Sequence, residues 1–160
     1  MKTLLTFNKI LLLACTSLYF GTGWSLVLFS FPIADQLTPD NYYMQFVPQV
    51  QAATAFFTYM TMVMMVSSVI FIIDEWKSSK KWYPIIVLVL VILATALTIL
   101  FIFQYNEQME AGITDQAVLQ EVLKKWMTLN TIRVSLWTLQ WLTLAVYFFK
   151  LDLKSSPAHE

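Results

Sequence analysis

The sequence predicts an all-α fold, a polytopic membrane bundle of four helices. Only 12% of its 160 residues are charged and the mean hydropathy is +0.64, whereas a soluble domain is roughly 25% charged. Charged residues are absent from three long stretches and a fourth contains Arg133 alone (10–34, 41–73, 82–106 and 126–149). A bilayer-spanning helix needs about 20 predominantly apolar residues, so each stretch is long enough. We expect one four-helix domain over residues 1–154, with spans at about 10–31, 50–73, 83–104 and 127–149, and a disordered tail over 155–160.

The first span resembles a cleavable signal at one point. Cys15 follows two lysines and a short apolar run, as in a lipoprotein cleavage box. A cleaved signal is followed by a polar mature chain. Here the apolar residues continue to Phe31, so we expect an uncleaved first helix over residues 10–31.

The fourth helix is predicted to begin outside the membrane. Gly112 breaks any helix that continues from the third span. Thr114 can then cap a new helix with Asp115 in its first turn, where a carboxylate suits the helix dipole. From there apolar residues recur at helical spacing, which predicts one unbroken helix from about Asp115 to Phe149.

Lysines are unevenly distributed between the two sides of the predicted bundle. Seven lie before the first span, between the second and third, or after the fourth (Lys2, Lys9, Lys77, Lys80, Lys81, Lys150 and Lys154). The two alternate loops hold only Lys124 and Lys125. By the positive-inside rule both termini are expected to be cytoplasmic, in the inner (plasma) membrane if the protein is bacterial.

Composition excludes several classes of chemistry. Ten basic and ten acidic residues leave no net charge, so no nucleic-acid partner is expected. The only histidine, His159, lies in the polar tail, and Cys15 is the only cysteine. Haem, zinc, a disulfide and a histidine-dependent nucleophile therefore lack their usual residues, and we expect neither a metal nor another cofactor.

Polar side chains form a stripe on the fourth helix. Trp126, Asn130, Arg133, Trp137 and Gln140 follow steps of four, three, four and three, which places them within a sector of roughly 80°. An arginine near the centre of a membrane helix costs about 2.5–3.5 kcal/mol, so it is expected to face the bundle interior with partners.

Other polar residues lie at the depth of this arginine, at the ends of the neighbouring spans. They predict a pocket that opens toward the outer face, walled by Trp24, Trp126 and Trp137, with Arg133 as its single fixed charge. Its remaining candidate residues are polar or acidic (Asp35, Gln49, Gln51, Thr54, Gln104, Asn106 and Glu107). Asp35 or Glu107 is the candidate counter-ion of Arg133.

Two alternatives belong to the same residues. Asn130 and Arg133 can instead bond across helices as structural links, for which gains of roughly 0.6–2 kcal/mol are typical. Gly21 and Gly23, with their neighbours Tyr19 and Trp24, predict close helix packing rather than a cofactor site. Intramembrane charge nevertheless favours a ligand or substrate role for Arg133.

Three stretches together resemble the anthrone-oxygenase-like family of small four-helix membrane proteins. They are Gly-Thr-Gly-Trp-Ser at 21–25 leading to Phe31-Pro32, Gln-Tyr-Asn-Glu-Gln at 104–108, and the Trp-x-x-x-Asn-x-x-Arg pattern at 126–133. The resemblance implies oxidation of anthrones to anthraquinones by molecular oxygen without a cofactor. It also implies that Asn106, Asn130 and Arg133 line the site.

The sequence thus leads to two hypotheses for function. In the first, the pocket takes a flat hydrophobic or quinone-like molecule and works as a cofactor-independent oxygenase. Arg133 and Asn130 would stabilise the substrate oxyanion, Glu107 would remove the proton, and the ligand would contact Gln104, Asn106, Trp126, Trp137 and Trp24. In the second, the protein is a non-enzymatic lipid- or quinone-binding protein, or an accessory subunit of a larger membrane complex. A homo-oligomer is compatible with both hypotheses.

Overall fold

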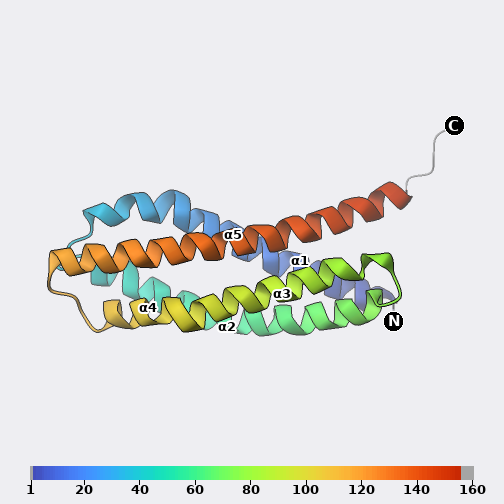
Figure 1. Cartoon of the computed structure of the whole chain (residues 1–160), viewed down its shortest axis with the longest axis horizontal. Coiled ribbons are helices and arrows are strands. Elements are labelled where there is room, and N and C mark those ends of the chain that lie inside the picture. Colours follow the sequence, from blue (N-terminus) through green and yellow to red (C-terminus); the bar gives the residue numbers. More distant parts are fainter. Residues whose placement is uncertain (1, 156–160) are drawn as a thin grey trace.

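Helices make up the architecture of this chain, whose computed structural model describes residues 2–155, with side chains to residue 151. Four long helical segments lie roughly along one axis (Figure 1). The elements are α1 (Lys2–Ser25), η1 (Leu26–Ser30), η2 (Phe31–Gln36), α2 (Tyr42–Glu75), η3 (Ser79–Lys81), α3 (Trp82–Leu97), η4 (Thr98–Ile102), α4 (Phe103–Glu110) and α5 (Gln116–Ser155). The predicted disordered tail lies outside the described residues, apart from Ser155, which ends α5.

The described chain contains four helical segments that are long and apolar enough to cross a membrane, as predicted. Each extends beyond the expected span (Lys2–Gln36, Tyr42–Glu75, Ser79–Glu110 and Gln116–Leu151). The second begins at Tyr42 rather than near residue 50, with Pro48 inside its early turns. Pro48 is the seventh residue of α2, so the helix lacks the hydrogen bond from this position to the carbonyl four residues earlier.

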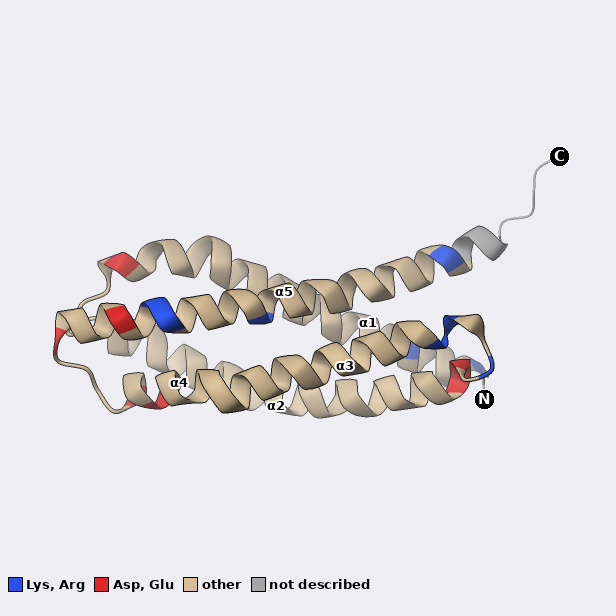
Figure 2. Cartoon of the chain, in the orientation of Figure 1, with Lys and Arg blue, Asp and Glu red and all other residues tan. Residues whose placement is uncertain are grey.

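Charged residues gather toward the two ends of the bundle (Figure 2). We call the end that holds the chain's N-terminus and the α2–α3 connection the lysine end. The opposite end holds the α1–α2 and α4–α5 connections, and we call it the acidic end. Arg133 lies within α5, well away in sequence from either end of that helix.

The start of α5 confirms one prediction and corrects another. Gly112 has a φ of +90°, a conformation that favours glycine, and it separates α4 from α5. The capping residue is Asp115, not Thr114. The Val118 N–H donates to Asp115 Oδ1 at 2.9 Å and the Leu119 N–H donates to the Asp115 carbonyl at 3.0 Å. A carboxylate at this position also interacts favourably with the helix dipole.

Close packing of α1 on α5 depends on Gly23 but not on Gly21. A Cβ added at Gly23 would lie 2.8 Å from Trp137 Cε3 and 2.9 Å from Val134 Cγ2. A Cβ added at Gly21 would meet nothing within 4 Å. The prediction of a packing role is therefore confirmed for Gly23 and wrong for Gly21, which lies on the exposed side of the same helix.

Two apolar clusters fill the bundle. One extends along the middle and the lysine end and includes Leu12, Phe71, Val87 and Leu144. The other, at the acidic end, is centred on residues such as Tyr42, Met109 and Trp126. The Tyr42 hydroxyl donates to the Met109 carbonyl at 3.0 Å and accepts from the Ile113 N–H at 2.6 Å, so it fixes the loop between α4 and α5 to the start of α2.

Candidate functional site

A cavity of about 890 Å³ lies between the helices, in the part of the bundle toward the acidic end. Residues from every described helical element except η3 line it, together with Leu37 after η2, and most of them are apolar or aromatic. Arg133 is the one charged residue of this lining; no carboxylate belongs to it. The volume falls toward the upper end of the range of about 300–1,000 Å³ that is usual for small-molecule sites.

The polar stripe of α5 faces the bundle interior, as predicted. Asn130 is 0% exposed and Gln140 1%, while the side chains of Trp126 and Trp137 are also buried. Trp126, Arg133, Trp137 and Gln140 line the cavity. Because the helix repeats every 3.6 residues, the polar residues that α5 contributes to the cavity all lie on one face of that helix.

Arg133 is held by three neighbours inside the cavity. One terminal nitrogen, Nη2, donates to Asn130 Oδ1, and Nη1 donates to Thr98 Oγ1 at 3.4 Å. The guanidinium carbon lies 4.7 Å from the centre of a Trp137 ring. Its Nε is buried and has no hydrogen-bond partner in the described chain. The guanidinium therefore keeps donor capacity that the protein does not use.

Asn130 belongs to a short chain of hydrogen bonds that orients its amide. Its Nδ2 donates to the Trp126 carbonyl at 2.8 Å, so its oxygen is left to face Arg133. The indole N–H of Trp126 donates in turn to Asn106 Oδ1 of α4 at 2.8 Å. This chain brings together four of the residues that the sequence singled out.

Aromatic rings form two groups along the cavity. Tyr19 packs against Trp137 at 4.7 Å and against Phe57 at 4.6 Å between ring centres. Toward the acidic end, Phe46 meets Trp126 edge-on at 4.6 Å. The Tyr19 hydroxyl is used within the fold, since it bonds to the Phe57 carbonyl at 2.8 Å and to Thr61 Oγ1 at 2.6 Å.

Two helical segments widen into π-helical turns where they border the cavity. They are η1, at the end of α1, and η4, between α3 and α4. Leu26 and Ser30 from η1 line the cavity, as do Thr98, Ile99 and Ile102 from η4. Such π-turns are rare and occur frequently at functional sites. The sequence does not predict them, because no residue pattern in these segments distinguishes a π-turn from an ordinary helix.

Several of the predicted site residues lie elsewhere. Gln104 and Glu107 are exposed and outside the cavity lining, and Asp35 is exposed on η2. Trp24 is 38% exposed and donates its indole N–H to Thr138 Oγ1 at 3.0 Å. A carboxylate at the end of a helix remains solvated there, whereas inside the cavity it would be desolvated.

Arg133 has no carboxylate partner within the described chain. The ion pairs of the described chain join Lys9 to Asp74, Lys9 to Glu75 and Lys125 to Glu121. The expectation that Asp35 or Glu107 is the counter-ion of Arg133 is therefore wrong. Residues 2–151 also contain no group of three His, Cys, Asp or Glu side chains arranged to hold a metal ion.

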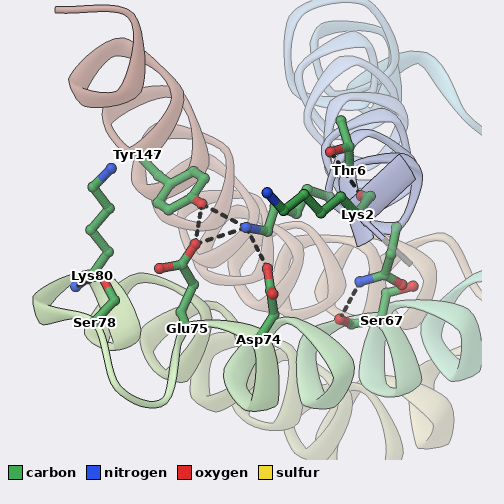
Figure 3. Close-up of polar contacts among 10 residues, drawn as sticks. Lys2, Thr6, Ser67, Asp74, Glu75, Ser78, Lys80 and Tyr147 are labelled. Atoms are coloured by element: carbon green, nitrogen blue, oxygen red, sulfur yellow. Dashed lines mark hydrogen bonds and ion pairs between the residues drawn. The ribbon is translucent and has the colours of Figure 1, made fainter. Parts of the chain in front are cut away.

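A polar cluster at the lysine end was not foreseen (Figure 3). Lys9 Nζ lies 2.6 Å from Asp74 Oδ2 and 2.7 Å from Glu75 Oε1. The Tyr147 hydroxyl accepts from Lys9 at 2.9 Å and donates to Glu75 at 2.6 Å. The cluster joins α1, α2 and α5. The signal in the sequence was the position of Lys9 just before the first predicted span and of Asp74 and Glu75 just after the second, on the same side.

Comparisons with known proteins add no relative: no family model, curated protein or solved structure matches this chain. The resemblance to the anthrone-oxygenase-like family stays a prediction from the sequence. The class that the fold itself defines is a bundle of four helices long and apolar enough to span a membrane, with an internal cavity that contains one arginine.

Proposed function

We propose that this protein binds a hydrophobic molecule with an electron-rich oxygen, an anionic oxygen above all, in the cavity beside Arg133. The observation that carries the proposal is the cavity lining, which has one guanidinium and no carboxylate. An anionic oxygen placed there would meet a positive charge that nothing in the described chain neutralises. Apolar and aromatic side chains would surround the rest of the molecule.

The geometry at Arg133 favours recognition of an oxyanion. The unpartnered Nε and the long 3.4 Å bond to Thr98 leave the guanidinium donors available. Hydrogen bonds from an ionised donor are shorter and roughly twice as strong as neutral ones. Asn130 fixes one edge of the guanidinium, so a ligand would meet an oriented group and not a freely rotating one.

Binding is tested with a matched pair of ligands, 2-hydroxy-1,4-naphthoquinone, which is anionic at neutral pH, and the uncharged 1,4-naphthoquinone. Quenching of tryptophan fluorescence in detergent reports occupancy, because Trp126 and Trp137 line the cavity. Wild type is expected to prefer the anion. Arg133→Gln should lose about 1.5–3 kcal/mol of affinity for it, roughly 10–100-fold, and little for the neutral quinone.

The exposed Lys125→Gln, on the same helix, is the matched control, since it also removes one positive charge. It should bind both ligands like wild type. An equal loss for the two ligands in Arg133→Gln would contradict recognition of an anion. Equal losses of affinity for the anion in Arg133→Gln and Lys125→Gln would mean that the net charge of the protein, and not a contact with Arg133, attracts the ligand.

An oxygenase activity is the more specific form of this proposal. The anion of an anthrone is a delocalised phenolate, and a guanidinium with an amide would stabilise its oxygen. Reaction of this anion with O₂ then places one oxygen atom in the new ketone and releases the other as hydroxide, which solvent protonates to water. Because Glu107 lies outside the cavity, it is not positioned as the base. The substrate would therefore bind as its preformed anion.

Oxygen uptake by the purified protein with a panel of anthrones and hydroquinones tests this form. Uptake above the spontaneous rate that is lost in folded Arg133→Gln and kept in Lys125→Gln would support an oxygenase. Binding of the anionic quinone without any oxygen uptake would support the alternative, a non-enzymatic binding protein or an accessory subunit of a membrane complex.

We also propose that the lysine end of the bundle is cytoplasmic. The lysine distribution supports this orientation, which places the cavity toward the outer leaflet. Single cysteines at Ser78 and Thr114, in a Cys15→Ser background, would be labelled with a membrane-impermeant maleimide in intact cells. Labelling of Thr114→Cys alone is expected, and labelling of Ser78→Cys alone would reverse the orientation.

A further inference from the structure

Hydroxyl groups along the end of the first segment differ from those elsewhere in the bundle. Many serines and threonines of the long helices donate to the carbonyl four residues earlier, as do Thr54, Thr58 and Thr95 at 2.7–2.8 Å. Thr22, Ser25 and Ser30 have no such bond in the described chain, and all three line the cavity.

These residues mark one side of an opening. Thr22 and Ser25 of α1 and Ser30 of η1 are exposed at the surface as well as lining the cavity. On α2 the same holds for Gln45, Gln49 and Thr58. We call this set of six residues the polar seam.

The seam begins where the contacts between α1 and α2 end. Tyr19 of α1 still bonds to Phe57 and Thr61 of α2. Toward the lysine end from there, Asn8 bonds to the Ser67 carbonyl at 2.9 Å and Lys9 pairs with Asp74. Toward the acidic end, the cavity separates the two helices. The polar seam thus lies beside the cavity on both helices, while toward the lysine end α1 and α2 are joined by these bonds.

Within the polar seam, Thr58 donates to the Thr54 carbonyl, whereas the hydroxyls of Thr22, Ser25 and Ser30 make no such bond. Polar groups left unpaired in this way are costly in hydrocarbon, because lipid tails offer them no hydrogen-bond partner. Deeper in the cavity, a further polar side chain also lacks a hydrogen-bond partner. Gln140 is 1% exposed, lines the cavity, and its Oε1 has no partner in the described chain. The polar seam and Gln140 therefore provide donors and acceptors to whatever occupies the path between them.

We infer that ligands enter the cavity sideways from the bilayer through the polar seam, so that the ligand class is a membrane-dissolved amphiphile and not a water-borne molecule. This inference rests on the proposed ligand cavity. The ligand's oxygen substituents would exchange interfacial water for the seam's hydroxyl and amide groups during entry. Its apolar part would stay in contact with lipid and then with the cavity's aromatic walls.

The test measures binding rates in phosphatidylcholine vesicles. The probe is a 2-hydroxy-1,4-naphthoquinone with a long alkyl chain, and stopped-flow quenching of tryptophan follows its binding. Ser25→Phe and Thr58→Phe would narrow the seam from its two sides. Ser135→Phe is the control, because Ser135 is exposed on α5 and outside the cavity lining. All three substituted positions are exposed, and thermal unfolding verifies that each variant folds.

Lateral entry predicts that both seam variants slow association and dissociation alike, by about tenfold, which corresponds to about 1.4 kcal/mol in the barrier. The dissociation constant would stay the same, and Ser135→Phe would behave as wild type. Unchanged rates in both seam variants would overturn lateral entry and leave the ligand cavity standing. Weaker affinity at an unchanged association rate would show that the seam contacts the bound ligand but is not its entry path, and this result would also overturn lateral entry. A wild type that binds no probe would overturn both proposals.

Discussion

The contact of Gly23 with α5 gives a prediction whose size follows from the structure. A Cβ at this position would lie 2.8 Å and 3.1 Å from Trp137 Cε3 and Cζ3, and 2.9 Å from Val134 Cγ2. Carbon atoms pack best at about 3.5–4.0 Å, so the side chains would have to move by roughly 1 Å. Trp137 is confined on two sides. The centre of the Tyr19 ring and the guanidinium carbon of Arg133 each lie 4.7 Å from a ring centre of Trp137. Overpacking of this kind costs about 1–3 kcal/mol.

Gly21→Ala is the matched control for Gly23→Ala. Both glycines lie in α1, and each replacement gains about 1 kcal/mol of helix propensity. Only the Gly23 variant creates a steric conflict, because an added Cβ at Gly21 meets nothing. The difference between the two variants therefore isolates the packing cost. We expect Gly21→Ala to unfold above Gly23→Ala by about 2–4 °C for each kcal/mol, given the chain length.

Thermal unfolding in detergent, followed by tryptophan fluorescence, measures this difference. A displaced Trp137 would also weaken ligand binding in Gly23→Ala, since that residue lines the cavity. Equal melting temperatures for the two variants would refute the reasoning, because they would mean that α1 and α5 do not approach as closely as described.

Two further contacts give predictions for the same unfolding measurement. Tyr42→Phe removes the hydroxyl shared by Met109 and Ile113 and is expected to cost about 1–3 kcal/mol, whereas Tyr43→Phe, at an exposed position, is expected to cost nothing measurable. Lys9→Met leaves two largely buried carboxylates unpaired and is expected to cost about 3 kcal/mol; melting at the wild-type temperature would contradict the cluster drawn in Figure 3.

The sequence was sufficient for the features that depend on one helix at a time. Stretches without charge predicted the four long helices, and Gly112 with the residues after it predicted where α5 begins. The steps of three and four along α5 predicted the face that turns inward, which includes Asn130 and Gln140. Each of these features follows from helix geometry and local chemistry, without knowledge of the neighbouring helices.

Features that depend on how helices meet could not be predicted in this way. Lys9 and Asp74 are 65 positions apart, and only the tilt and rotation of α1 and α2 bring their side chains together. Asp35 and Glu107 were assigned to Arg133 from depth alone, yet each remains at a solvated end of its helix. The π-turns η1 and η4 likewise belong to the packed bundle and not to a residue pattern.

The hydrogen-bond donors of Arg133 help to decide whether this residue links helices or binds a ligand. A guanidinium has five N–H donors, and the described chain offers it Asn130 Oδ1 and a distant Thr98 oxygen, both uncharged. A residue retained only to join helices would gain stability from its partners, so its loss would lower the melting temperature. A charge retained for a ligand instead lowers the stability of the ligand-free protein.

We therefore expect Arg133→Met to melt at or above the wild-type temperature without ligand, and to lose the stabilisation that the anionic quinone gives to wild type. A lower melting temperature without ligand, with quinone stabilisation intact, would assign Arg133 to helix association and withdraw the ligand site.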